Sequence, residues 1–351
     1  MREYIWHSDD EAGDFLTAYF DASKRVLFIG SIGFDPRTFW IFNTLKDNVA
    51  ASIEPVFIME ERSLVSEALK RASEANESRL KVMLGTEVNV TNIPIFTEDR
   101  ALIGGRKIVE FALNLPIADY TDIVIDIGAM SRGIFFPLVR CLRERIQLEE
   151  LDTSLHLLVI DHPELDYSVK PDYEDRASYM HGFDGGVQRI GNGDQMRLWV
   201  PQLAADRRAV YDSLFSLVKP SDVCPVLPFP GINAKMVDEL AAEYHEQILD
   251  SWNTELQNIF LAAESDPLDL YHTVFRLNNS RKALFEGIYS TITVLSPLGT
   301  KVSTIGGLLA AMDLDLPVAY VETSGYNSTS PMLEGGKLVH VWVDGPIYNN
   351  L

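Results

Sequence analysis

The sequence is poor in cysteine and contains no long apolar run, and each shortage excludes a class of protein. Cys141 and Cys224 are the two cysteines in 351 residues, and each lies in an apolar stretch, so we expect buried free thiols. No stretch approaches the ~20 apolar residues of a membrane-spanning helix. The opening segment MREYIWHSDDEAGDF has no apolar core typical of a signal peptide. We therefore expect a cytoplasmic protein without a membrane partner.

Basic residues are also scarce, because 30 lysines and arginines face 51 acidic residues, for a formal net charge of -21. This balance argues against general nucleic-acid binding, which requires clustered cations. It still permits one small anionic ligand in a locally basic pocket.

Motifs for metals and common cofactors are incomplete. The seven histidines form no H-x-x-x-H pair, and no Cys/His spacing suggests zinc. The turn Gly30-Ser-Ile-Gly33 lacks the third glycine of a dinucleotide fingerprint, although Glu60 or Glu61 could accept ribose hydroxyls. The segment SPLGTK departs from a Walker A loop in its glycines and spacing. The sequence therefore identifies no metal site, and the cofactor stays unknown.

Short apolar runs separated by helical patterns predict the fold. Such runs indicate parallel strands covered on both faces. We predict an α/β protein of two Rossmann-like parallel-sheet halves with a cleft between them. The predicted domains are 1–165 and 201–351, with 166–200 as a connection or lid. The predicted strands are 25–30, 53–59, 122–127, 155–160, 223–229, 291–297, 317–322 and 337–345, and helical spacing is clear in 35–48, 63–84, 134–147, 234–252 and 301–313.

Four predicted strand-to-helix loops share one construction: small residues, a helix-capping residue, and a cation in the opening turn of the helix. The predicted caps are Asp35, Ser131, Asn233 and Thr300, and the cations are Arg37, Arg132, Lys235 and Lys301. The order of these loops in the two halves also suggests a duplication.

A cation is disfavoured at a helix N-terminus by roughly 0.3–1 kcal/mol, because that end already carries partial positive charge. A bound anion reverses the sign, and glycines let a phosphate approach the backbone. The alternative is that the cations point into solvent, or that Arg37 pairs with Asp35. The predicted ligand-binding residues are Gly30, Ser31, Gly33, Arg37, Gly128, Ser131, Arg132, Asn233, Lys235, Ser296, Gly299, Thr300 and Lys301.

Further candidates depend on the chemistry. If the protein is an enzyme, Asp126 or His162 is the expected general base. Tyr320, Tyr326 and Tyr348 are candidates for stacking on a base, although such aromatics are more often core residues.

The segment TITVLSPLGTKVSTIGGLLAAMDLDLPVAYVE (291–322) resembles the second ligand-binding element of CRISPR-associated Rossmann-fold (CARF) sensor domains. Gly299, Thr300 and Lys301 carry the resemblance, and Gly30 through Asp35 correspond loosely to the first element. The resemblance implies a cyclic-oligoadenylate type of ligand and a role in antiviral defence or signalling.

These patterns favour a cytoplasmic protein that binds a nucleotide or another phosphorylated small molecule and passes a signal to a separate effector protein. One alternative is an enzyme acting on a nucleotide or sugar-phosphate, such as a transferase or phosphodiesterase. A second alternative is a protein-interaction subunit with a vestigial pocket.

Overall fold

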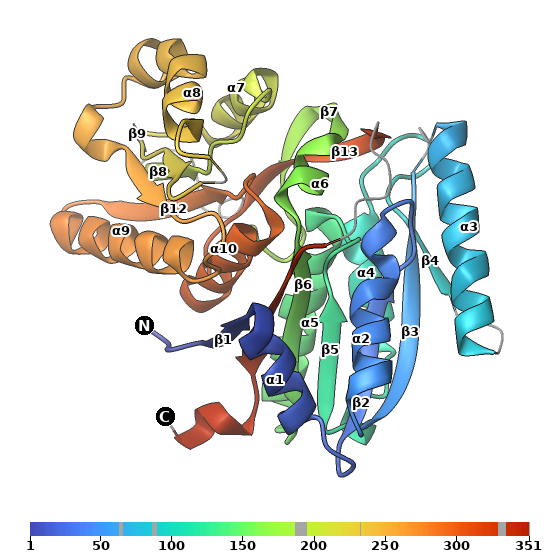
Figure 1. The fold of residues 1–351 in the computed structure, drawn as a ribbon. Helices are drawn as coiled ribbons and strands as arrows, with labels where there is room; N and C mark the ends of the chain where they lie inside the picture. Colours follow the sequence, from blue (N-terminus) through green and yellow to red (C-terminus); the bar gives the residue numbers. More distant parts are fainter. Residues whose placement is uncertain (63–65, 86–89, 187–194, 232, 329–334, 351) are drawn as a thin grey trace. The chain divides into compact units, whose positions relative to one another are not determined.

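Parallel strands alternate with helices along the chain, which confirms the predicted α/β class (Figure 1). The computed structural model describes residues 1–351 except 63–65, 86–89, 187–194, 232, 329–334 and 351. The chain forms two units, an N-terminal one of Arg2–Asp172 with Ser324–Leu351, and a C-terminal one of Tyr173–Thr323. Strands β7 (Val169–Tyr179) and β13 (Ala319–Ser328) pair with each other where the chain passes between the units.

The N-terminal unit is built on a seven-stranded sheet. Its first five strands in space are parallel, and the last two run antiparallel to their neighbours. In spatial order they are β4 (Val90–Pro94), β3 (Ser52–Glu61), β2 (Arg25–Ser31), β5 (Asp122–Asp126), β6 (Ser154–Asp161), β14 (Lys337–Asp344) and β1 (Ile5–Ser8). Counted along the chain from β2, the parallel strands follow the Rossmann order 3-2-1-4-5.

Helices cover both faces of this sheet (Figure 1). One face packs Phe28, Phe57 and their neighbours against α1 (Asp9–Tyr19), α2 (Trp40–Asn48) and α3 (Glu67–Leu84). The other is covered by α4 (Gly104–Leu113) and α5 (Arg132–Leu148), which pack on each other. Every residue of β5 and β6 is buried as a result, and each fully buried large apolar side chain contributes about 1.5–3 kcal/mol.

The C-terminal unit repeats the same strand order. Strand β8 (Gln195–Pro201) lies between β12 (Ser290–Ser296) and β9 (Asp222–Val223), and all three are parallel. Beyond β9, a bridge from Gln202 to Val226 leads to β10 (Val226–Pro228) and β11 (Phe260–Ala262), and a bridge from Leu295 to Val318 leads to β13. Its helices are α7 (Arg208–Val218), α8 (Met236–Glu243), α9 (Asp269–Phe285) and α10 (Lys301–Leu314). The order is again 3-2-1-4-5, so the two units repeat one another. The loops expected to correspond do not, because the loop of Arg37 follows the first strand of its unit and the loop of Lys235 follows the second.

Three features differ from the sequence prediction. The stretch 166–200 contains β7 and the start of β8, so it holds the central strand of the C-terminal sheet. Strand β14 pairs with β6, so it completes the N-terminal sheet although it follows the C-terminal unit in sequence. The helix expected over 234–252 is shorter, because α8 ends at Glu243. None of the described helices is long and apolar enough to cross a bilayer.

Candidate functional site

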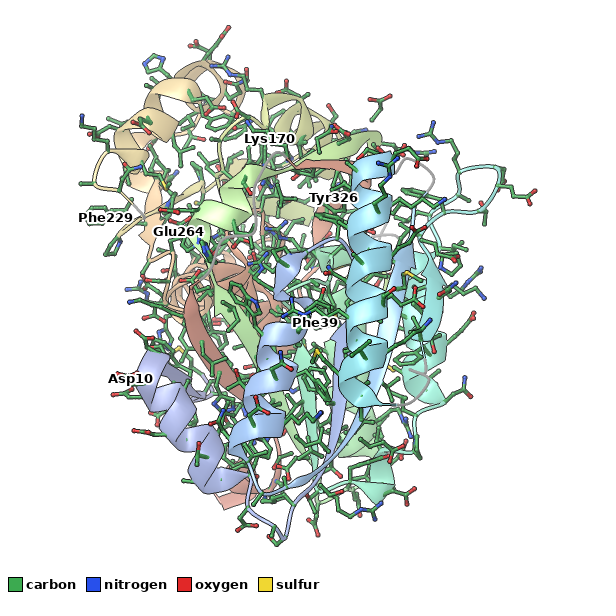
Figure 2. The ribbon with its side chains drawn as sticks, turned by 45° about the vertical axis from the view of Figure 1, so that its right-hand side comes forward. Asp10, Phe39, Lys170, Phe229, Glu264 and Tyr326 are labelled. Atoms are coloured by element: carbon green, nitrogen blue, oxygen red, sulfur yellow. The ribbon has the colours of Figure 1, made fainter. Side chains whose placement is uncertain are left out.

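The candidate site lies where β2 and β5 end side by side in the N-terminal sheet. The strand order reverses at this point, and open α/β sheets bind ligands at such crossover points, beyond the carboxyl ends of the strands. The loops from Gly33 to Arg37 and from Asp126 to Arg132 leave the sheet here. Figure 2 shows Tyr326 on the side of the N-terminal unit toward which these strands run.

In the first loop, the side chain of Arg37 is bound by carboxylates of the protein. Asp35 caps the helical turn Pro36–Phe39, as predicted, and its carboxylate accepts a hydrogen bond from the Arg37 amide at 2.9 Å. The Arg37 guanidinium, 2% exposed, grips Asp35 with two bonds of 3.0 and 2.8 Å, and also contacts Asp166 at 2.9 Å. Burial disfavours the charge, but Asp35 and then Asp166 outweigh it and raise the pKa of Arg37. The alternative that Arg37 pairs with Asp35 is confirmed.

The small residues of the first loop differ in their surroundings. A Cβ on Gly30 would lie 2.8 Å from the Phe57 ring, so this glycine serves packing, and Ser31 is buried beside it. A Cβ on Gly33 would meet no described atom within 4 Å, so the backbone is accessible there. The Gly33 carbonyl accepts a 2.7 Å bond from the Asn76 amide of α3, which holds the loop in place.

The second loop contains a hydroxyl that has no hydrogen-bond partner in the described part of the chain. Ser131 is the N-cap of α5, as predicted, yet its side chain makes no capping bond. Its Oγ is buried and has no hydrogen-bond partner among the described residues. Buried hydroxyls are nearly always hydrogen-bonded in proteins. An atom of this kind is a candidate contact for a ligand or a water molecule. Arg132 begins the helix directly after it, as predicted.

Asp126, the last residue of β5, stabilises the same loop through a hydrogen bond. It is 3% exposed, and its carboxylate accepts a 2.8 Å bond from the Gly128 amide. A Cβ on Gly128 would lie 2.9 Å from that carboxylate oxygen, so a side chain at this position would displace the Asp126 carboxylate.

Glu60 and Arg62, at and just after the end of β3, extend the site from β2 to the neighbouring strand β3. Glu60 accepts a 2.7 Å bond from the Ser131 amide and a 2.8 Å ion-pair contact from Arg62. The Arg62 guanidinium lies over the Tyr326 ring at 5.3 Å, and Phe34 lies 5.4 Å from the same ring. Glu60 and Tyr326 are predicted from the sequence as candidates, whereas Arg62 and Phe34 are not. The position of Arg62, two residues beyond Glu60 on a strand end, was the available signal.

Two other candidates lie in structural positions. His162 caps the short helix α6 (Pro163–Ser168), and its Nδ1 accepts a 3.3 Å bond from the Leu165 amide. The Tyr348 hydroxyl accepts a bond from the Ile5 amide, so this ring anchors β1.

In the C-terminal unit, the loop after β12 is filled by protein contacts. Ser296 is fully buried, accepts a 3.0 Å bond from the Trp199 indole and donates to the Ala319 carbonyl at 2.8 Å. A Cβ on Gly299 would lie 2.4 Å from Gln202. Thr300 caps α10, as predicted, and Lys301 begins the helix.

The loop that carries Asn233 and Lys235 follows β10, which is the second strand of the C-terminal order. The crossover point of that sheet lies between β8 and β12, so this loop is displaced from it by one strand. Asn233 accepts a 2.9 Å bond from the Lys235 amide, and α8 begins at Met236. Both side chains are exposed. Within the described part of the chain, no group of three His, Cys, Asp or Glu residues could hold a metal ion.

Comparisons with known proteins give no family. No family model and no curated protein matches the chain. Among solved structures, the chain is similar to a protein provisionally named a UDP-N-acetylglucosamine 2-epimerase from Listeria monocytogenes. The identity is 8%, the match covers 84% of this chain and 78% of that chain, and the TM-score is 0.23. A likeness this weak indicates nothing about function.

The resemblance to CARF sensor domains is wrong. No family model, of CARF domains or of any other family, matches the chain. The Gly-Thr-Lys turn is part of the internal bonding of its unit, because the Gly299 amide donates to Gln202 and the Thr300 hydroxyl donates to the Glu264 carbonyl.

Proposed function

We propose that the N-terminal unit binds a phosphorylated, nucleotide-like small molecule beyond the carboxyl ends of β2 and β5. The buried Ser131 hydroxyl without a partner among the described residues carries this proposal. It lies at the start of the 17-residue helix α5, directly before Arg132. A helix N-terminus attracts anions through its dipole and through first-turn amides, such as that of Gly133, that have no acceptor within the helix.

Glu60 supports a ligand that also carries hydroxyl groups. A carboxylate has about four acceptor positions. The bonds from the Ser131 amide and from Arg62 use two of them. The remaining positions suit ribose or sugar hydroxyls, which an acidic residue after the second strand of a Rossmann order can accept. The partly exposed rings of Phe34 and Tyr326 add an apolar surface beside it.

The test is thermal unfolding with inorganic phosphate, AMP, ADP, UMP and UDP, together with chromatography of the mixtures to detect products. We expect a nucleotide to raise the melting temperature of the wild type, because a ligand at a hundred times its Kd stabilises the folded state by about 2.7 kcal/mol. Turnover of the nucleotide would favour the enzyme alternative, in which Asp126 is the nearest candidate base.

Ser131→Ala is the decisive variant. We expect it to weaken binding about tenfold and to leave the stability of the free protein unchanged, because the Ser131 side chain makes no capping bond. Ser78→Ala is the matched control, since the Ser78 hydroxyl of α3 is exposed and bonds to the Glu74 carbonyl. Equal affinities of the two variants, or a wild type that binds none of these probes, would refute the proposal.

A further inference from the structure

Three histidines and one aspartate form a continuous hydrogen-bonded chain across four neighbouring strands of the N-terminal sheet. His7 of β1 contacts His340 of β14 through their Nδ1 atoms at 3.1 Å. His340 Nε2 lies 2.9 Å from His156 Nδ1 on β6, and His156 Nε2 lies 3.2 Å from Asp122 Oδ1 on β5. His156, His340 and Asp122 are fully buried, whereas His7 is partly exposed. The chain therefore links a buried carboxylate to the surface.

The carboxylate at the inner end fixes the direction of every bond. Asp122 accepts, so His156 donates from Nε2, and its Nδ1 is left as an acceptor. His340 must then donate from Nε2, and His7 must donate from Nδ1. With all three imidazoles neutral, each bond has one donor and one acceptor, and the lone pair of His7 Nε2 remains at the outer end.

The groups around the chain favour its neutral form. Phe15 of α1 stacks on His7 and His340 at 4.4 and 4.5 Å, and Trp342 of β14 lies 4.8 Å from His156. Burial is the main cause that lowers the pKa of His7, His156 and His340.

Charged and polar groups act on the two ends. At the inner end, Asp122 accepts from Tyr19 at 2.8 Å and from Thr121 at 2.6 Å, and Lys24 lies 3.5 Å away. At the outer end, Glu11 of α1 opposes burial by raising the pKa of His7.

We propose that this chain is a proton-operated latch that holds β1 on β14. The chain accommodates one proton with all its bonds intact. A proton from solvent binds His7 Nε2, His7 passes its Nδ1 proton to His340 Nδ1, and His340 passes its Nε2 proton to His156 Nδ1. The net result is an imidazolium at His156 beside the Asp122 carboxylate, and the reversed bonds still pair one donor with one acceptor.

A second proton cannot be accommodated in the same way. After the first transfer His340 donates from Nδ1 to His7 Nδ1. A second proton on His7 places an N–H on both sides of this 3.1 Å contact and a second positive charge in the chain. The bond between β14 and β1 is lost, and the like charges repel. Strand β1 has only four residues, so its last two, His7 and Ser8, can separate from β14 with the loss of few backbone bonds.

The latch acts on the His7 end of β1, because separate contacts hold the residues before it. The Ile5 amide bonds to Tyr348, and Arg2 forms a 2.8 Å ion pair with Asp344. Release of His7 and Ser8 leaves the facing part of β14, Val339 and His340, with unpaired backbone groups that another strand can pair with.

Hydrogen exchange of the full chain, read by mass spectrometry between pH 7.5 and 5 and corrected for intrinsic rates, tests the latch. We expect exchange at His7 and Ser8 to rise at least tenfold toward pH 5, while β2 stays protected. In His7→Gln the rise should disappear, because no proton enters. In Glu11→Gln the rise in exchange should occur at lower pH, because the carboxylate that raises the pKa of His7 is removed.

His245→Gln, at an exposed histidine of the C-terminal unit, is the control and should behave as wild type. Exchange in β1 that does not change with pH would overturn the proposal. So would a rise of equal size in His7→Gln.

Discussion

Arg37 shows how one side chain can follow a pattern typical of anion binding and serve another purpose. The local sequence predicts its cap and its place in the helical turn correctly. It cannot predict Asp166, which approaches the guanidinium from far along the chain. A cation at a helix start is therefore stabilised here by two carboxylates, and no ligand is needed to explain it.

Replacement of Arg37 should be strongly destabilising. Arg37→Met leaves Asp35 and Asp166 without their counter-charge in a buried setting, and breaking a buried ion pair typically costs about 3–5 kcal/mol. Urea denaturation of the two proteins measures the loss. Arg106→Gln, which removes an exposed pair with Glu110, should give no measurable change. A loss below about 1 kcal/mol for Arg37→Met would contradict the buried pairing.

Ser131 shows the opposite case. Its identity as a cap was predictable from the sequence, but it was not predictable that its hydroxyl has no hydrogen-bond partner among the residues that the structure describes. That property depends on where the side chains of other elements end, and such side chains are distant in sequence. Arg62 and Phe34 were missed for the same reason, because only the folded sheet brings them to the Tyr326 ring.

At the scale of the element, strongly apolar strands were the easiest to predict. The run 122–127 matches β5, and 155–160 lies within β6, because both strands are buried on both faces. Strand β8 was missed although it is central. Its first three residues are only partly buried, and two of them, Gln195 and Arg197, are polar. The predicted helix 234–252 was too long, because its periodic pattern continues past Glu243 into a π-helical turn, Gln247–Ser251.

The cap of α10 gives a prediction for a single element. The Thr300 hydroxyl accepts a 3.3 Å bond from the Ser303 amide and donates a 2.9 Å bond to the Glu264 carbonyl. Thr300→Ala should lower the free energy of unfolding by about 1–2 kcal/mol, the usual cost of a lost cap. Thr17→Ala on α1, where the hydroxyl bonds to the Gly13 carbonyl without capping, is the control. Equal midpoints of denaturation for both variants would show that the cap is unimportant.

At the scale of the whole molecule, the two units share the strand order 3-2-1-4-5. The sequence predicted a repetition but matched its loops wrongly, because the loop of Arg37 follows the first strand of its order and the loop of Lys235 follows the second. The pairing of β14 with β6 and β1 was not predictable in this way. Strand patterns reveal which face of a strand is apolar, but not which distant partner covers its edge.

The stability of the protein should decrease as the pH falls. The pKa values of His156 and His340 are lowered by burial, so the unfolded chain binds more protons than the folded one below about pH 6.5. The pKa of Asp122 is also lowered: burial opposes this, but bonds from His156 and Thr121 outweigh it, which adds a loss at lower pH. We expect the free energy of unfolding to fall by on the order of 1–3 kcal/mol per pH unit below pH 6.5.

Urea denaturation at pH 8, 7, 6 and 5 measures this dependence. His156→Gln should flatten it, whereas His245→Gln should not. A wild type equally stable at pH 8 and pH 5 would contradict the assignment of neutral buried histidines.

The position of β14 has a consequence for synthesis on the ribosome. The eight residues of β6, all buried in the finished protein, emerge long before the strand that covers their edge. Until the C-terminal unit has been translated, the edge of β6 in the N-terminal unit is unpaired. Strands of other nascent chains can then pair with this edge. Folding of the N-terminal unit is therefore completed only after residues 337–344 have been synthesised, and chaperone protection of β6 during that interval would reduce mispairing.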